Sequence, residues 1–311
     1  MNLYDIAEYL KTYDNYEILT HAYPDGDTLG SAYALCMALQ QMGKNARVIT
    51  TNIPSKFVYL LNGVKEQYFA CEKIISVDVA AESLLGSNMS SYVGKIDLCI
   101  DHHGTNTVNA TNKYVDKTAA AACEIMYKLL LRLKTNFTKE IANCLYTGIS
   151  TDTGCFRYTN TSSETMRIAA NLMDCGCDTA YINKAMFETK SKEKIMLERA
   201  VYDTMSFYAD GKCAIIHTTL EMFKALNIGD DEMEGLASIP RQIEGVLIGI
   251  TMREKEGGFF KISVRTNENI NASDFCGIFG GGGHPAASGC TIEGDLETVK
   301  SKLVKAVEEF L

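Results

Sequence analysis

The chain has 311 residues, of which 46% are hydrophobic and 22% are charged, and its formal net charge is −9. This length fits two domains, and the composition is ordinary for a globular protein. The acidic balance excludes the broad basic surface by which proteins bind long nucleic acids.

The N-terminal segment MNLYDIAEYLKTYDNYEILTH has no basic region followed by an apolar core, which argues against a signal peptide. No stretch approaches the roughly 20 apolar residues of a membrane span, so we expect a cytoplasmic protein with no membrane association. The 11 cysteines lie at scattered positions without the spacing of a disulfide framework or a zinc site. We expect reduced, mostly buried thiols.

Short apolar strands alternate with helical patterns in the first half of the chain. We predict strands at 16–21, 46–50, 73–79 and 95–101. We predict helices at 28–43, 118–133, 139–151, 163–176 and 179–188. Nearly continuous apolar strands separated by helices are typical of a parallel α/β sheet.

The pattern changes after a charged amphipathic segment at 190–205, which predicts a connecting helix. Strands are predicted at 212–219, 245–254 and 259–266, and a closing helix at 297–311. We therefore expect an α/β protein with two domains joined by a helical linker. The N-terminal domain would have a parallel sheet with helices on both faces, and the smaller C-terminal domain a mixed sheet. The predicted ranges are 1–188, 189–210 for the linker, and 211–311.

Acidic residues and histidines cluster where the predicted strands end. They are His21, Asp25, Asp27, Asp78, Asp101, His102, His103 and Asp152. Singly, each has a plain interpretation: DGD is typical of a solvated turn, and an aspartate often caps a helix. Together they would converge on the edge where parallel sheets bind ligands. Carboxylates so close repel one another unless cations lie between them. A mixed carboxylate and imidazole set suits Mn²⁺ above Mg²⁺, with Zn²⁺ or Co²⁺ as alternatives.

The segment NASDFCGIFGGGGHPAASGC at 271–290 is the second notable stretch. Its four consecutive glycines allow close backbone approach, so that amide groups can line an anion site. The small residues at 286–289 suit the packing of a helix start. A flexible hairpin loop is the alternative interpretation.

Four motifs, HAYPDGDTLGSA, VDVA, CIDHHGTN and TGISTDTGCFRY, occur in the order found in DHH phosphoesterases. The resemblance covers nearly the whole chain and is nearest to the branch of oligoribonucleases (nanoRNases) and 3′-phosphoadenosine-5′-phosphate (pAp) phosphatases. It implies two divalent ions, most simply Mn²⁺, with Mg²⁺ or Co²⁺ as substitutes. The implied metal ligands are His21, Asp25, Asp27, Asp78, His102 and Asp152.

The resemblance also implies a role for each of these residues. One ion would bind His21, Asp25 and Asp78, and the second ion would share Asp78 with the remaining three ligands. Asp101 would orient an imidazole, and His103 would face the substrate phosphate. In the C-terminal domain, the terminal phosphate or nucleotide would be held by Arg265, Gly280, Gly281, Gly282, Gly283 and His284.

The implied activity is hydrolysis of short RNA or pAp to mononucleotides, with no action on long nucleic acid. A soluble phosphodiesterase of linear or cyclic diadenylates is the nearest alternative, and a catalytically silent nucleotide-binding protein is an alternative of another class. Family II pyrophosphatases have a lysine- and arginine-rich C-terminal signature that the sequence lacks. The sequence leaves open the direction of cleavage and whether the protein forms a homodimer.

Overall fold

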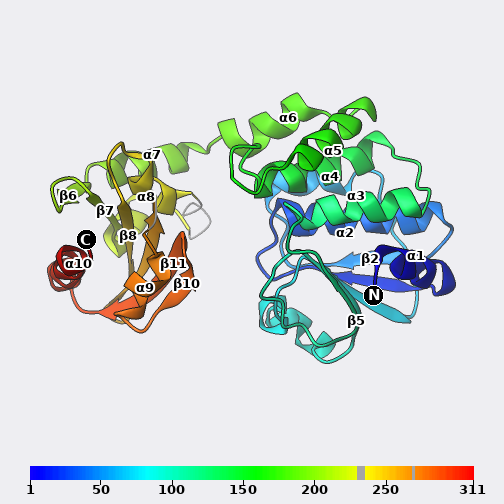
Figure 1. The fold of residues 1–311 in the computed structure, drawn as a ribbon, viewed down its shortest axis with the longest axis horizontal. Coiled ribbons are helices and arrows are strands. Elements are labelled where there is room, and N and C mark those ends of the chain that lie inside the picture. Colours follow the sequence, from blue (N-terminus) through cyan, green and yellow to red (C-terminus); the bar gives the residue numbers. More distant parts are fainter. Residues whose placement is uncertain (230–234, 268–269) are drawn as a thin grey trace. The chain divides into compact units, whose positions relative to one another are not determined.

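The computed structural model describes residues 1–229, 235–267 and 270–311. The chain divides into two compact units, Met1–Thr189 and Lys190–Leu311 (Figure 1). The ranges 1–188, 189–210 and 211–311 stay a prediction. Within the described residues, no helix combines the length and the apolar character needed to cross a bilayer.

A five-stranded parallel sheet forms the centre of the first unit, with the strand order β2-β1-β3-β4-β5. The strands are β1 (Tyr16–Leu19), β2 (Ala46–Ile49), β3 (Lys73–Val77), β4 (Ile96–Asp101) and β5 (Ala110–Val115). After β1 the chain forms β2 on one side of β1 and then β3 on the other side. The strand order therefore reverses direction between β1 and β3, which makes this a topological switch point. Ligands bind beyond the carboxyl ends of strands at such a point.

Long α-helices cover one face of this sheet (Figure 1). The helices of the unit are α1 (Leu3–Thr12), α2 (Gly26–Gln41), α3 (Ala122–Arg132), α4 (Lys139–Asp152), α5 (Ser163–Asp174) and α6 (Thr179–Asn183). Side chains alternate between the faces of a strand, and Ile18, Ile75 and Leu98 point into the core below these helices.

The opposite face is covered by short 3₁₀ helices, η2 (Glu82–Leu85) and η3 (Ser87–Tyr92). Leu85 and Met89 of these helices pack with Leu19 and Cys99 of the sheet. The predicted helical cover on both faces is therefore confirmed, although one cover consists only of short 3₁₀ helices. A third 3₁₀ helix, η1 (Ser55–Leu61), packs against α2 and α4.

The second unit contains a six-stranded mixed sheet with the order β10-β11-β9-β8-β7-β6. The strands are β6 (Ser206–Tyr208), β7 (Cys213–Thr218), β8 (Ile248–Lys255), β9 (Phe259–Thr266), β10 (Gly282–His284) and β11 (Ala287–Glu293). Only the pairing of β7 with β8 is parallel among these described strands. The predicted α/β architecture with a second, mixed sheet is confirmed.

The helices of this unit lie on both sides of its sheet. They are α7 (Lys192–Tyr202), α8 (Leu220–Leu226), α9 (Ala272–Gly277) and α10 (Leu296–Phe310). Phe275 of α9 and Leu303 of α10 share a core with Ile250 and Val264. Leu197 of α7 packs in another cluster with residues that include Ile216, so the predicted connecting helix packs within the second unit.

The sequence patterns missed several elements and misassigned one. Strand β5, with the sequence ATNKYV, is mostly half-buried at the sheet edge and lacks the apolar run of its neighbours. The elements α1, β6, α8, α9, β10 and β11 were also not predicted. The small residues at 286–289 do not start a helix, because Ala287 begins strand β11 and pairs with both β9 and β10. Most of the 11 cysteines are buried, as predicted.

Helices α2 and α4 cross in close contact at Gly30, where an added Cβ would overlap the carbonyl oxygen of Cys144. Because this oxygen belongs to a helix backbone, it cannot move aside cheaply. We predict that Gly30→Ala lowers the free energy of unfolding of the first unit by about 1–3 kcal/mol. Urea denaturation measures the change. Gly277→Ala is the control, since its added Cβ meets no atom within 4 Å; equal effects of the two changes would contradict the close crossing.

Candidate active site

The start of helix α2 places two aspartates in different roles. Asp25 is the N-cap, and its side chain accepts hydrogen bonds from the amides of Asp27 and Thr28 at 3.0 and 3.1 Å. Asp27 lies in the first turn and is fully buried. Its carboxylate accepts hydrogen bonds from the amides of Ala122 and Cys123, at 2.6 and 2.8 Å. Two helix N-termini, those of α2 and α3, therefore stabilise the negative charge of this turn.

Asp78 follows the last residue of β3 and has a φ of +54°. This left-handed conformation is uncommon for residues with a side chain, and aspartate and asparagine adopt it more readily than most. The side chain is 4% exposed. Burial, followed by the charges of Asp27, Asp25 and Asp101, raises the pKa of Asp78 well above its usual value. The backbone thus holds a carboxyl group at a position where burial and neighbouring carboxylates disfavour its ionised form.

Two groups of side chains share the surroundings of Asp78. In the first group, Nε2 of His21 lies 3.7 Å from Asp25 Oδ2 and 3.9 Å from Asp78 Oδ2. In the second, Nε2 of His102 lies 3.3 Å from Asp152 Oδ2, 3.5 Å from Asp78 Oδ1 and 3.8 Å from Asp27 Oδ2. The ligand atoms of His21, Asp25 and Asp78 lie within 4.8 Å of one another, and so do those of Asp27, His102 and Asp152. Asp78, His102 and His103 form a third such group, and each of the three could hold a metal ion.

Asp152 joins the second group from a helix. It is the last residue of α4, whereas the sequence placed it after a helical run. Burial, followed by the charges of Asp27, Asp78 and Asp25, raises the pKa of its carboxyl group well above the usual value. The cluster therefore draws on the ends of strands and on helices α2 and α4.

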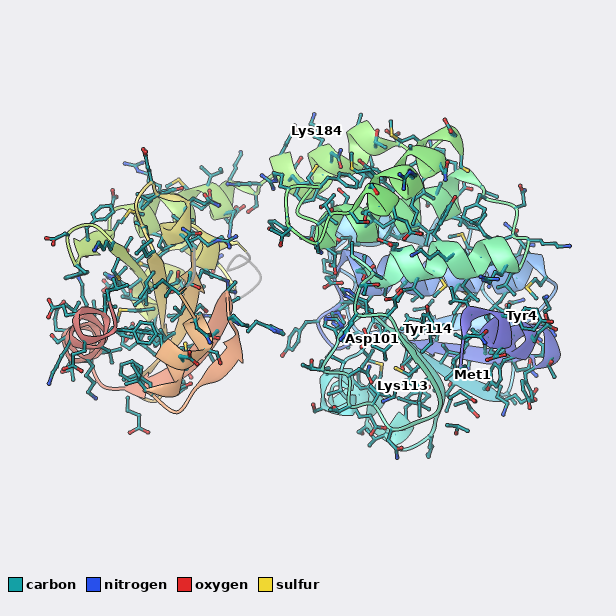
Figure 2. All side chains as sticks on the ribbon, in the orientation of Figure 1. Met1, Tyr4, Asp101, Lys113, Tyr114 and Lys184 are labelled. Atoms are coloured by element: carbon teal, nitrogen blue, oxygen red, sulfur yellow. The ribbon has the colours of Figure 1, made fainter. Side chains whose placement is uncertain are left out.

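Asp101 is the last residue of β4 and organises the two histidines after it. Figure 2 labels Asp101 at the end of this strand. Its Oδ1 accepts hydrogen bonds from the amide of His102 at 2.7 Å and from Nδ1 of His103 at 2.8 Å. Its Oδ2 accepts a hydrogen bond from the amide group of Asn106 at 2.6 Å.

These bonds keep Asp101 ionised. Burial raises the pKa of its carboxyl group, but the hydrogen bonds from His103 and Asn106 and the charge of His103 outweigh burial and hold the pKa below its usual value. The sequence reasoning missed Asn106, although the residue stands in the quoted motif CIDHHGTN. Asn106 also donates to the carbonyl oxygen of Val79 at 2.9 Å, which ties the loop after β4 to the loop after β3.

The glycine segment of the second unit forms a hairpin rather than a loop alone. Strand β10 pairs with β11 through Gly282 and Gly289, Gly283 and Ser288, and His284 and Ala287. The amides of Gly280 and Gly281 donate to the carbonyl oxygens of Gly277 and Cys276, at 3.0 and 2.9 Å. These two amides therefore already have acceptors within the chain, and the role of the segment in anion binding stays a prediction.

Two domain families match the chain: "DHH family, N-terminal domain" over residues 16–149 and "DHHA1 domain" over residues 215–311. The bifunctional oligoribonuclease and PAP phosphatase NrnA of Thermus thermophilus is 31% identical, over 98% of this chain and 93% of the relative. The chain belongs to the DHH family of phosphoesterases.

Other relatives of this DHH protein agree. The NrnA of Bacillus subtilis is 25% identical over 93% of this chain and 92% of the relative. The crystal structure of an exopolyphosphatase-related protein from Bacteroides fragilis has a TM-score of 0.89 at 26% identity, covering 99% of this chain and 96% of that one. The predicted resemblance to DHH phosphoesterases of the NrnA branch is confirmed.

Divalent cations suit the cluster of this DHH protein. Oδ1 of Asp78 and Nε2 of His102 are buried and find no hydrogen-bond partner among the residues that the structure describes. Nδ1 of His102 lies 3.4 Å from the carbonyl oxygen of Ala119, an arrangement that leaves Nε2 as the ligand atom. Unpartnered buried polar atoms are costly, and carboxylates with imidazoles are ligands for divalent transition metals.

We predict that Asp78→Asn relieves the charge repulsion in the cluster and at the same time weakens its binding of metal ions. Asparagine keeps the size of the side chain and tolerates the left-handed backbone, while it removes one negative charge. In chelator, the melting temperature should equal or exceed that of the wild type, because repulsion falls. Added Mn²⁺ should stabilise the wild type, by about 2.7 kcal/mol at a hundredfold excess over Kd, and the variant far less.

Asp174→Asn, at the exposed end of α5, is the matched control and should respond to Mn²⁺ as the wild type does. Thermal unfolding with and without Mn²⁺ measures both effects. Equal stabilisation of Asp78→Asn and wild type by Mn²⁺ would exclude Asp78 as a ligand.

Proposed function

We propose that this enzyme hydrolyses short oligoribonucleotides and pAp to mononucleotides with two divalent cations, preferably Mn²⁺. The observation that carries the proposal is the clustering of potential metal ligands around Asp78, which lies 3.9 Å from Nε2 of His21 and 3.5 Å from Nε2 of His102. The substrate class is supported by the NrnA relatives, whose names describe an oligoribonuclease and PAP phosphatase. We place the reaction in the cytoplasm, where short RNA and nucleotides occur.

In this proposal His21, Asp25 and Asp78 would hold one cation. The second cation would be held by Asp27, Asp78, His102 and Asp152. When bound, the two cations would polarise a phosphoryl oxygen, lower the pKa of an attacking water and stabilise the leaving oxygen.

Asp101 and His103 would act beside this centre. The hydrogen bond of 2.8 Å from Nδ1 of His103 to ionised Asp101 fixes the orientation of the imidazole. The imidazole is 41% exposed, and its Nδ1 also lies 3.6 Å from Oδ1 of Asp78. The Nε2 edge of the imidazole would then contact a phosphate oxygen of the substrate. Asp101 would keep His103 in place for that contact.

In the second unit we propose that Arg265 and the segment Gly280–His284 bind the terminal phosphate. Arg265 is half-buried on β9, and its Nη1 donates to the carbonyl oxygen of Val264 at 3.0 Å. Its side chain presents several donors to an anion, and guanidinium groups form paired, charge-assisted bonds to phosphate. Arg265→Lys would not restore this geometry.

We predict that hydrolysis requires a divalent metal and is fastest with Mn²⁺. Chelator should reduce turnover by roughly a thousandfold or more, because cation stabilisation of the transition state contributes several kcal/mol. The measurement is kcat/KM on pAp, RNA of two to five nucleotides, pApA, cyclic di-AMP and pyrophosphate. pAp and short RNA should be the best substrates.

Two results would redirect the proposal. Highest kcat/KM on cyclic di-AMP would favour the diadenylate phosphodiesterase. Tight binding of pAp without turnover in any metal would favour a catalytically silent nucleotide-binding protein.

We also predict that efficiency falls as RNA grows beyond roughly five nucleotides. An acidic chain has no extended basic surface, so added phosphates contribute little binding free energy. The measurement is kcat/KM on a length series of 5′-labelled RNA at two salt concentrations, where the dependence on salt should be shallow. Equal kcat/KM on a dinucleotide and on a 24-nucleotide strand would instead indicate a long-strand exonuclease.

A further inference from the structure

Arg241 lies beside Arg265, although no sequence motif pointed to it. It belongs to the short 3₁₀ helix η7 (Pro240–Gln242), which packs against β8. Its side chain is partly exposed.

The strand register shows how the two arginines come together. Gly249 of β8 pairs with Arg265 of β9, Arg265 pairs with Ala287 of β11, and Ala287 pairs with His284 of β10. All three pairings are antiparallel, so directly opposed residues point to the same face of the sheet. The four residues therefore form one row, on the face opposite the core that contains α9 and α10.

Small residues flank Arg265 in this row, and η7 lies directly over one of them. A Cβ added to Gly249 would come within 2.8 Å of the amide nitrogen and 3.2 Å of the Cβ of Arg241. Asn267 holds this backbone in place, because its Nδ2 donates to the carbonyl oxygens of Arg241 and Val246 at 2.9 and 2.8 Å. The fold thus positions Arg241 next to the neighbour of Arg265.

The two guanidinium groups are close enough to influence each other. Burial, followed by the positive charge of Arg241, lowers the pKa of Arg265. Within residues 1–229, 235–267 and 270–311, neither arginine forms an ion pair with a carboxylate. Two like charges held together, with no carboxylate partner in the described part of the chain, favour the binding of an anion.

We propose that Arg241 and Arg265 together bind a doubly charged terminal phosphate, and that Arg241 sets the preference for substrates that carry one. A terminal phosphate has a charge of about −1.5 to −2 at pH 7, whereas each internal phosphodiester has a single charge. Two adjacent guanidinium groups match the charge of a terminal phosphate. This inference rests on the proposed function, since it names a residue that selects its substrates.

The experiment compares pApA with ApA, which differ only in the 5′-phosphate. Binding is measured by calorimetry in chelator, so that no turnover occurs, and kcat/KM is measured with Mn²⁺. The variants are Arg241→Ala, Arg241→Gln, which keeps a long polar side chain, and Arg241→Lys. Lys305→Ala is the control, because it removes one positive charge from the exposed side of α10.

We expect Arg241→Ala and Arg241→Gln to weaken binding of pApA by about tenfold to a hundredfold, the effect of losing charge-assisted bonds. Binding of ApA should change less than twofold, Arg241→Lys should recover part of the loss, and Lys305→Ala should match the wild type. Unchanged binding of pApA, or an equal loss for ApA and pApA, would overturn the inference.

The two proposals can fail separately. If the wild type hydrolyses pApA but Arg241 variants bind it normally, only the role of Arg241 is wrong. If the wild type hydrolyses none of the substrates while Arg241 still selects for the 5′-phosphate, only the proposed function is wrong.

Discussion

Repulsion among buried carboxylates is the constraint on which the first unit depends. Asp27 and Asp78 are almost fully buried, and Asp152 lies against the same imidazole as both. Such a cluster persists only if the surrounding structure stabilises its charges. The chain supplies part of that stabilisation through the amides of Ala122 and Cys123, and divalent cations would supply the remainder.

The packing around the cluster serves the same requirement. Gly30 lets α2 approach α4 closely, and an added Cβ on Gly148 of α4 would lie 2.6 Å from Oδ1 of Asp27. The small residues therefore allow two helices to bring Asp27 and Asp152 to one point. The left-handed backbone of Asp78 adds the third carboxylate from the sheet.

The second unit brings positive side chains together on its mixed sheet, whereas the first unit brings carboxylates together. Its mixed sheet places Arg265 between Gly249 and Ala287, and these small neighbours leave room for Arg241 above the sheet. Adjacent positive charges are suited to phosphate, as adjacent negative charges are suited to metal ions. A phosphoester substrate needs both kinds of site, one for the reacting phosphorus and one for an end that does not react.

The parallel sheet of the first unit and the acidic residues and histidines at its carboxyl ends could be predicted from the sequence, because apolar strands and acidic motifs are local patterns. The sequence also indicated Arg265 and the glycine segment. It could not indicate strand β5 or the hairpin of β10 and β11, since a polar edge strand and a glycine-rich strand lack the apolar alternation that marks a strand. The partners of Asp27, the anchoring role of Asn106 and the position of Arg241 beside Arg265 became visible only in the folded chain. These depend on contacts between segments far apart in the chain, and such contacts leave no periodic signal in the sequence.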